Sequence, residues 1–252
     1  MTLDQKIEQA ATLINQANTV VAMTGAGIST LSGIPDFRSP DSGVWRQDDP
    51  LSVASIHAFR HNPETFYRWI HPLSKLFFEA EPNPAHLALA SLERKGKLSA
   101  IVTQNIDNLH QRAGSKTVFE LHGHLRQATC TQCYRVQDSR AIFEKFIADG
   151  EVPHCPDCGG VLKPNAILFG EQLPMQEFVA AQMAIQGADL MLLVGSSLEV
   201  APASDLPHTA LDNGASVIII NYLPTFLDSQ AQLVINDNIA TILPRIDALI
   251  PG

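Results

Sequence analysis

The sequence predicts an α/β protein with a doubly wound parallel (Rossmann-like) sheet and a smaller lobe made of a helical insertion and a zinc-ribbon insertion. Two observations lead to this prediction. Short apolar runs typical of buried parallel strands recur along the chain, and most of them end in small or polar residues. A helical stretch and a stretch with two Cys-x-x-Cys pairs interrupt this series, so we expect them to form a lobe outside the sheet.

The first predicted elements are a surface helix and a buried strand. Apolar residues in segment 1–18, among them Leu3, Ile7 and Ile14, recur at helical spacing. The apolar run 19–23 that follows is typical of a buried parallel strand.

That strand leads into the stretch from Thr24 to Arg38, which reads TGAGISTLSGIPDFR. Gly25 and Gly27 permit a tight turn and let backbone N–H groups approach a pyrophosphate, which indicates a dinucleotide site. Thr30 stands where the usual dinucleotide signature has a third glycine, so the glycine pair alone is a weak motif.

The next segment, 39–52, is polar and rich in Asp, Gly and Pro. A dinucleotide-dependent dehydrogenase would have its second strand here, ending in an acidic residue, and the absence of such a strand argues against that class. The segment is either a loop that closes over a cofactor or a plain surface loop. Just before it, Phe37 either shields a reactive sugar, with Arg38 meeting phosphate, or docks in the core.

Two helices, at 63–80 and 84–95, precede a strand at 98–103 that ends in Gln104-Asn105-Ile106-Asp107. Ligands of parallel sheets bind at such carboxyl ends. Asn105 and Asp107 lie two positions apart and point the same way if the strand geometry continues. The carboxylate then accepts from an amide such as that of nicotinamide, or caps the next helix in an Asx turn, and both interpretations can hold together.

A short strand at 118–121 ends at His122. A lone histidine is more often structural than catalytic, so this position alone is weak evidence for a general base. His86 and His110 lie in helical stretches, where we expect them to pack or to hydrogen-bond.

All four cysteines fall into two Cys-x-x-Cys pairs, at Cys130/Cys133 and Cys155/Cys158. A two-residue gap lets both thiolates of a pair face one ion, and two pairs complete a tetrahedron, which favours a structural zinc ion over disulfides or separate thiols. Four protein ligands leave no open position for catalysis.

The remaining segments complete the sheet. Strands are predicted at 188–194, ending in Gly195-Ser196-Ser197, at 216–220, ending in Asn221, and at 233–235, with a closing helix at 239–249. The extended stretch 165–171 either pairs with a bound peptide or forms an interior strand.

Composition sets further limits. The formal net charge of −9 disfavours direct nucleic-acid binding and suits either basic protein substrates or mere solubility. No apolar run is long enough to span a membrane and segment 1–18 lacks the pattern of a secretory signal, so we expect a cytoplasmic protein without membrane contact.

From about Val20 to about Ile239 the motifs, in this order, resemble those of the sirtuin family, the NAD-dependent protein deacylases. The resemblance implies a deacetylase that transfers the acetyl group of acetyl-lysine to ADP-ribose and releases nicotinamide, O-acetyl-ADP-ribose and free lysine. NAD is then a consumed co-substrate, proteins or peptides with acetyl-lysine are the partners, and one structural zinc ion is bound. In sirtuins the histidine that matches His122 is the general base.

The resemblance carries over to named positions. Catalytic roles fall to His122 and Asn105. The implied NAD-binding residues follow the strand ends, namely Gly25, Ala26, Gly27, Ile28, Ser29, Thr30, Asp36, Phe37, Arg38, Gln104, Asn105, Ile106, Asp107, His122, Gly195, Ser196, Ser197, Asn221, Tyr222, Asn238 and Ile239. The implied peptide-binding residues are Ile167, Leu168, Phe169, Gly170 and Glu171, and the implied zinc ligands are Cys130, Cys133, Cys155 and Cys158.

Two departures from the family pattern stand out, and one further difference separates this chain from a subgroup of the family. Tyr222 stands where a smaller or aliphatic residue is commoner in relatives. Asn238 stands at a position that is often acidic in relatives. Sirtuins that remove acidic acyl groups resemble the stretch around Tyr67 but carry an arginine three residues later, where this chain has Ile70.

We expect residues 1–40, 82–124 and 164–252 to form a discontinuous NAD-binding Rossmann-like domain, residues 41–81 a helical and cofactor-loop module, and residues 125–163 a zinc-binding module. The alternative function is ADP-ribosyl transfer or NAD hydrolysis on the same fold. A non-catalytic NAD sensor and a zinc-containing dehydrogenase are further rivals, disfavoured by His122 and by the missing second strand.

Overall fold

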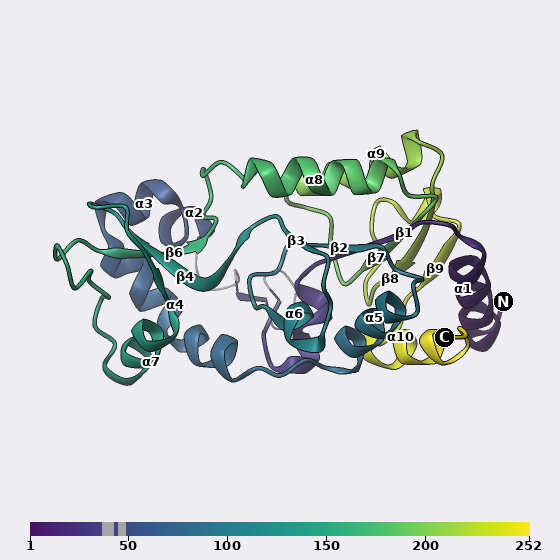
Figure 1. Ribbon diagram of the computed structural model, residues 1–252, viewed down its shortest axis with the longest axis horizontal. Helices are drawn as coiled ribbons and strands as arrows, with labels where there is room; N and C mark the ends of the chain where they lie inside the picture. The colour runs from purple at the N-terminus through teal and green to yellow at the C-terminus, as the bar shows by residue number, and fades with distance from the viewer. Residues whose placement is uncertain (37–42, 45–48) are drawn as a thin grey trace.

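The computed structural model describes residues 1–36, 43–44 and 49–252. Figure 1 shows two lobes joined side by side, with both chain termini at the far end of the larger lobe. Within the described residues, every helix is too short or too polar to cross a lipid bilayer.

The larger lobe is built on a six-stranded sheet in the order β3-β2-β1-β7-β8-β9, with all neighbours parallel. Its strands are β1 (Val20–Thr24), β2 (Ala100–Thr103), β3 (Val118–Glu120), β7 (Leu190–Val194), β8 (Ser216–Ile220) and β9 (Leu233–Ile235). The strand order reverses between β1 and β7. Such a switch point leaves a crevice at the carboxyl ends of the two strands, which is where ligands of doubly wound sheets bind.

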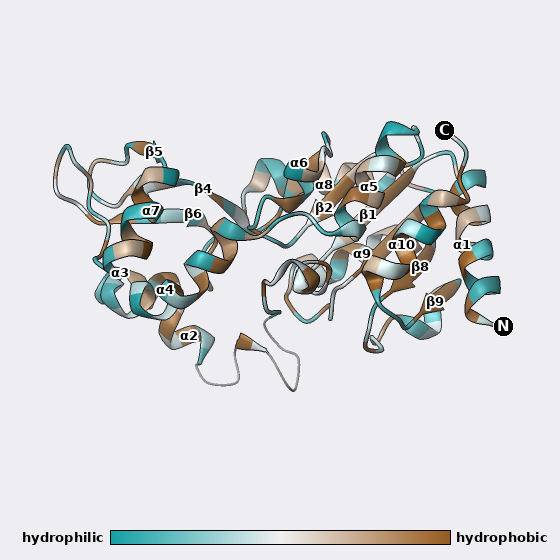
Figure 2. Ribbon diagram, turned by 90° about the horizontal axis from the view of Figure 1, so that it is seen from below, coloured by the Kyte–Doolittle hydropathy of each residue, from teal (hydrophilic) through white to brown (hydrophobic). Residues whose placement is uncertain are grey.

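Helices cover both faces of this sheet. One face packs against α1 (Leu3–Gln16), α5 (Pro84–Arg94) and α10 (Ile239–Ala248), and the other against α8 (Met175–Gln186) and α9 (Leu206–Asp212). Alternate residues of β1 enter the two cores, with Val20 and Ala22 on one side and Val21 and Met23 on the other. The apolar strands therefore lie between helices (Figure 2), which confirms the predicted doubly wound fold.

The smaller lobe combines the two insertions. Its elements are α2 (Pro50–Val53), α3 (Ile56–His61), α4 (Pro63–Glu79), β4 (Gly123–Cys130), β5 (Val136–Asp138), α7 (Arg140–Asp149) and β6 (Leu162–Ala166). The three strands form an antiparallel sheet in the order β5-β4-β6. Aromatic residues from both insertions, including Phe59, Tyr67, Phe143 and Phe146, share one core, so the helical and cysteine-bearing segments fold as one packed unit.

Candidate active site

Glycines join the ends of β1 and β7 at the switch point. Gly25 N–H donates to Val194 O at 3.1 Å and Gly27 N–H to Gly195 O at 2.9 Å. A Cβ atom on Gly27 would lie 2.9 Å from Gly195 O, and one on Gly195, which has φ +62°, would lie 2.4 Å from Ile28 N. The two loops therefore touch through backbone, and the amides of Gly25 and Gly27 are engaged within the chain.

Ser29 connects the two polar residues expected at the end of β2. Asn105 Nδ2 donates to Ser29 Oγ at 3.1 Å and to Gly25 O at 3.1 Å, and Ser29 Oγ donates to Asp107 Oδ2 at 2.7 Å. All three residues are buried. The structure thus brings Ser29, Asn105 and Asp107 together as one hydrogen-bonded set at the carboxyl edge of the sheet.

Asp107 also closes the predicted Asx turn. Its Oδ1 accepts from Leu109 N at 2.9 Å, at the start of α6 (Leu109–Ala113). Burial raises the pKa of this carboxyl, while the hydrogen bonds from Leu109 and Ser29 oppose that rise. The turn is therefore confirmed, and a contact with the nicotinamide amide stays a prediction.

Two buried histidines lie behind this set. His86 Nε2 is 3.5 Å from Ser29 Oγ, and His110 Nε2 is 2.9 Å from Thr24 Oγ1, with the two rings 5.0 Å apart. Burial lowers the pKa of His86 to about 4 and that of His110 well below its usual value. Both rings are neutral near pH 7, and the prediction that they pack and hydrogen-bond is confirmed.

His122 stands in the turn between β3 and β4, half-buried. Its Nδ1 lies 2.9 Å from Gln104 O. A carbonyl oxygen can only accept, so the neutral ring carries its hydrogen on Nδ1 and its basic lone pair on Nε2. A second group orients the general base in the same way in other catalytic sites, and the catalytic role of His122 itself stays a prediction.

The ends of β7 and β8 carry the next group of predicted residues. Gln104 Nε2 donates to Ser196 Oγ at 3.1 Å, and Asn221 Nδ2 donates to Ser196 O at 3.2 Å. Ser196 and Asn221 are buried, whereas Tyr222 is 76% exposed and Ser197 is exposed. The structure links Gln104, Ser196 and Asn221 across neighbouring strand ends.

The other predicted NAD residues lie around this edge. Ala26 and Ile28 belong to a 3-10 helix after β1, and Thr30 begins a second one, with its hydroxyl donating to Gly27 O at 3.1 Å. Ile106 is half-buried in the loop after β2. Asn238 caps α10 by accepting from Ala240 N at 3.0 Å, and Ile239 is buried.

The loop after β1 is described as far as Asp36, whose carbonyl accepts from Val44 N at 3.0 Å. The predicted residues Phe37 and Arg38 lie outside the described residues, as does most of the predicted cofactor loop.

The stretch 167–171 joins the two lobes beside His122. Ile167 N–H donates to His122 O at 2.8 Å, and Phe169 N–H donates to Ala54 O at 2.9 Å. Leu168 N–H donates to Glu171 Oε2 at 2.7 Å, and Glu171 pairs with Lys163 at 2.9 Å. Gly170 has φ +81°. β6 ends at Ala166, so the stretch is not an interior strand, and its pairing with a peptide stays a prediction.

The four cysteine sulfur atoms lie within 4.8 Å of one another, and none of these cysteines, all within the described chain, is in a disulfide. The sulfurs of Cys130 and Cys158 are 3.4 Å apart and those of Cys133 and Cys155 3.8 Å apart. Zinc–sulfur bonds of about 2.3 Å give a tetrahedron with edges of about 3.8 Å, so the sulfurs fit one zinc ion without a vacant position.

One residue that holds the site was missed. Asn83 Nδ2 donates to Ile28 O at 2.7 Å and to Ser32 Oγ at 3.1 Å, which fixes the loop after β1 to the start of α5. The Asn83-Pro84 pair indicates only a helix start, because the loop it contacts lies far away in the sequence.

Comparisons with known proteins agree on one family. Residues 25–202 match the sequence model of the Sir2 family. The chain is 43% identical over 245 residues to "NAD-dependent protein deacylase 2" of Archaeoglobus fulgidus, covering 97% of this chain and 96% of that protein. It is 42% identical over 246 residues to the "NAD-dependent protein deacetylase" of Sulfolobus acidocaldarius, covering 98% and 96%.

Solved structures agree with these relatives. A structure described as "Structural Basis for the Mechanism and Regulation of Sir2 Enzymes" superposes with a TM-score of 0.91 at 42% identity and 98% coverage of both chains. A Sir2 protein with a deacetylated p53 peptide and 3′-O-acetyl ADP-ribose gives 0.91 at 38% identity, covering 97% of this chain and 99% of the other. A Sir2 complex with a p53 peptide and NAD+ gives 0.85 at 38% identity, covering 98% and 97%.

Proposed function

This chain belongs to the Sir2, or sirtuin, family, and from that premise we propose how its switch-point crevice works. The protein is an NAD-dependent protein-lysine deacetylase. It transfers the acetyl group of acetyl-lysine to ADP-ribose and releases nicotinamide, O-acetyl-ADP-ribose and free lysine. The observation that carries the mechanism is the orientation of His122. Its Nδ1–H donates to the carbonyl of Gln104, which makes Nε2 the basic nitrogen. Gln104 directly precedes Asn105, a member of the hydrogen-bonded group with Ser29 and Asp107.

NAD supplies the nicotinamide–ribose bond that is broken and the ADP-ribose that accepts the acetyl group. The nicotinamide amide would be held by Asp107 and Ile106, because a buried carboxylate acceptor beside an apolar side chain suits a planar carboxamide. The phosphates and the adenosine would lie along the ends of β1, β7 and β8 and the start of α10. Asn105, held by Ser29, would orient the ribose end.

His122 acts as the general base in this proposal. Its Nε2 takes a proton from a ribose hydroxyl, and the Gln104 carbonyl holds Nδ1–H while the ring becomes positively charged. A positioned base of this kind contributes about a hundred- to ten-thousandfold in rate.

Zinc has a structural role. Cys130, Cys133, Cys155 and Cys158 would hold one ion, which would supply a rigid cross-link between the end of β4 and the segment that precedes β6. Because all four positions are taken by thiolates, no coordination site remains for substrate.

The substrate is a protein or peptide segment with an acetyl-lysine, bound along 167–171 next to His122. The amides of Ile167, Leu168 and Phe169 already donate within the chain, so a peptide strand here would donate its own N–H groups to the carbonyls of this stretch. We also propose a cytoplasmic location, where four thiolates stay reduced, and no direct binding of nucleic acid, given the net charge of −9.

One incubation tests the proposal. The protein is mixed with an acetyl-lysine peptide, with and without NAD, and the products are identified by mass spectrometry. Deacetylated peptide and O-acetyl-ADP-ribose in equal amounts, formed only with NAD, are expected. ADP-ribosylated peptide or free ADP-ribose alone would indicate the transferase or hydrolase alternative, reduced cofactor a dehydrogenase, and unchanged NAD a sensor.

A further inference from the structure

An ion pair outside the proposed catalytic set spans the turn that carries His122. Glu120 ends β3 and Arg126 lies within β4. Arg126 Nη1 donates to Glu120 Oε1 at 2.7 Å and Nη2 donates to Oε2 at 2.5 Å. Such two-point pairing fixes the direction of both side chains. The Glu120 side chain is only 11% exposed, so the carboxylate depends on this partner.

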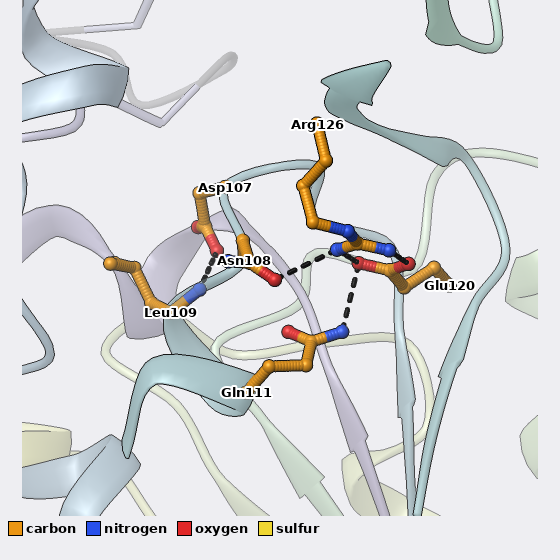
Figure 3. Close-up of polar contacts among 6 residues, drawn as sticks. All are labelled: Asp107, Asn108, Leu109, Gln111, Glu120 and Arg126. Carbon is orange, nitrogen blue, oxygen red and sulfur yellow. Dashed lines mark hydrogen bonds and ion pairs between the residues drawn. The ribbon is translucent and has the colours of Figure 1, made fainter. Parts of the chain in front are cut away.

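The same pair is hydrogen-bonded to the loop that carries Asp107 and to the helix that follows it (Figure 3). Arg126 Nη1 donates to Asn108 Oδ1 at 2.8 Å, and Gln111 Nε2 donates to Glu120 Oε1 at 2.9 Å. Asn108 has a left-handed backbone with φ 63° and makes no side-chain cap bond to α6. Its amide oxygen is therefore directed to Arg126, and the turn is tied to β4.

Asp107 depends on the shape of this turn. Its Oδ1 accepts from Leu109 N, and the left-handed backbone of Asn108 sets where that N–H points. The negative charge of Glu120 also raises the pKa of Asp107, as a smaller cause than burial, and Arg126 offsets that charge at close range. Position and charge state of Asp107 are both linked to the pair.

We propose that Glu120 and Arg126 form a clamp that positions the Asp107 turn for the nicotinamide end of NAD and keeps it in register with His122. The clamp rests on the proposed function, since it gives the pair a task in NAD binding. Both are positioning residues that act through Asn108. Loss of the clamp weakens binding of NAD and nicotinamide, whereas a pair that only stabilised the fold would leave the KM for NAD of folded protein unchanged.

The test uses two single variants, their combination and a control. Arg126→Ala removes the clamp but leaves the nearly buried Glu120 carboxylate without a cation, with only the hydrogen bond from Gln111, which can prevent folding. Asn108→Gly removes the side chain whose amide oxygen accepts from Arg126 and leaves the Glu120–Arg126 pair in place, and glycine adopts the left-handed backbone easily. Arg245→Ala breaks an exposed pair between α10 and Asp4 of α1, which touches none of these residues, and serves as the control.

In folded protein, Asn108→Gly and Arg126→Ala are each expected to raise the KM for NAD and the inhibition constant of nicotinamide about tenfold, because small misplacements of a binding group have large effects. The KM for the acetyl-lysine peptide should stay within about twofold in every variant, and Arg245→Ala should match the original protein. The double variant should be no worse than the more affected single variant, because both changes break the same contact.

An unchanged KM for NAD and an unchanged inhibition constant of nicotinamide in folded Asn108→Gly would overturn the clamp. A double variant whose loss equals the product of the two single losses would overturn it as well. The outcome is separable from the function itself. If the original protein fails to deacetylate with NAD, the proposed function fails, and titration calorimetry of NAD against the same variants still decides whether the clamp supports binding.

Discussion

At the scale of single residues, the partner of each side chain fixes what that side chain can do. The Gln104 carbonyl sets the tautomer of His122, and Ser29 joins Asn105 to Asp107 by accepting from one and donating to the other. His86 and His110 have the same titrating ring as His122, but burial keeps them neutral. His122 is only half-buried and lies against the Gln104 carbonyl, so its surroundings differ from theirs, and the base role proposed for it stays a prediction.

His122→Ala is expected to abolish deacetylation and to leave the fold intact, because the half-buried ring contributes a proton acceptor and little packing. We expect turnover to fall about a hundred- to ten-thousandfold, the range for loss of a general base. Product formation by mass spectrometry and the melting temperature check this. Near-normal turnover in folded His122→Ala would show that another group is the base.

His86 should make stability sensitive to acid. Unfolded His86 binds a proton below about pH 6.5, whereas the folded residue, with a pKa of about 4, does so only below that value. The free energy of unfolding is therefore constant with respect to His86 above pH 6.5 and falls by up to about 3 kcal/mol between pH 6.5 and 4. His110, whose pKa is also lowered by burial, adds to this loss of stability in acid. Urea unfolding of His86→Gln should show a flatter pH dependence than the original protein or exposed-residue control His61→Gln.

The acyl preference depends on Ile70. Tyr67 and Ile70 are 1% and 5% exposed, Tyr67 Oη donates to Leu162 O, and Arg68 is exposed on α4. An acidic acyl group near Ile70 would bury a carboxylate without a cation, which costs several kcal/mol. We expect acetyl-lysine peptides to be preferred over succinyl-lysine peptides by about a hundredfold in kcat/KM.

Matched acetyl and succinyl peptides at saturating NAD measure this preference. Arg68→Ala should leave the ratio unchanged, because Arg68 faces the lobe surface. If the original protein has equal kcat/KM for the two peptides, and Arg68→Ala loses activity on the succinyl peptide alone, then Arg68 reaches the acyl carboxylate.

At the scale of elements, the crevice depends on how closely the loops after β1 and β7 approach. Gly27→Ala would place a methyl group 2.9 Å from Gly195 O, and the atoms that it would meet all belong to the backbone of Gly195. We expect a loss of about 1–3 kcal/mol in the free energy of unfolding and a strongly reduced affinity for NAD, since the two loops must separate. Gly187→Ala, with its nearest neighbour an ordinary 3.6 Å away, is the control. Equal NAD affinity in Gly27→Ala and Gly187→Ala would contradict this account of the crevice.

Elements with local signals could be predicted from the sequence. The strand before Gly25, the strand end at Gln104–Asp107 and the cysteine pairs all carry their pattern within a few residues. Helix α8 was missed because its own apolar residues lie on every side of it. Met175, Val179 and Met183 are exposed, whereas Ala181 and Ile185 are buried. The sequence therefore lacks the one-sided pattern by which helices are predicted.

Contacts between distant segments could not be predicted. Glu120 and Arg126 look like ordinary surface charges in strands, and only the β3–β4 turn brings them together over Asn108. The sequence indicates that Gly25 and Gly27 open a turn for a pyrophosphate, but it does not show that their own amides donate to Val194 O and Gly195 O at the end of β7. The resemblance indicates the positions of Gly25 and Gly27, whereas the role of Arg126 and the partners of all four residues are visible only in the fold.

At the scale of the whole molecule, β4 connects the metal centre to the crevice. It begins at Gly123, next to His122, and ends at Cys130, while β6 runs back to Ala166 beside the 167–171 stretch. Cys130 and Cys155 pack with Ala128 and Leu162 in a small core of their own. Such a small core cannot hold the strand ends together without a cross-link, so we expect the zinc ion to maintain the geometry of His122 from a distance.

The purified protein is accordingly expected to contain one zinc ion per chain, and Cys155→Ser or a strong chelator should unfold the smaller lobe and abolish deacetylation. Structural zinc contributes about 10–16 kcal/mol of apparent binding energy in small modules, more than the remaining contacts of these strands can replace. Hydrogen exchange should show lost protection in residues 123–166, while β1, β7 and β8 stay protected because their two cores do not involve the cysteines. Elemental analysis that finds no metal, together with intact disulfides by mass spectrometry, would refute the zinc site. Full activity of metal-free protein would show instead that β4 holds His122 in place without it.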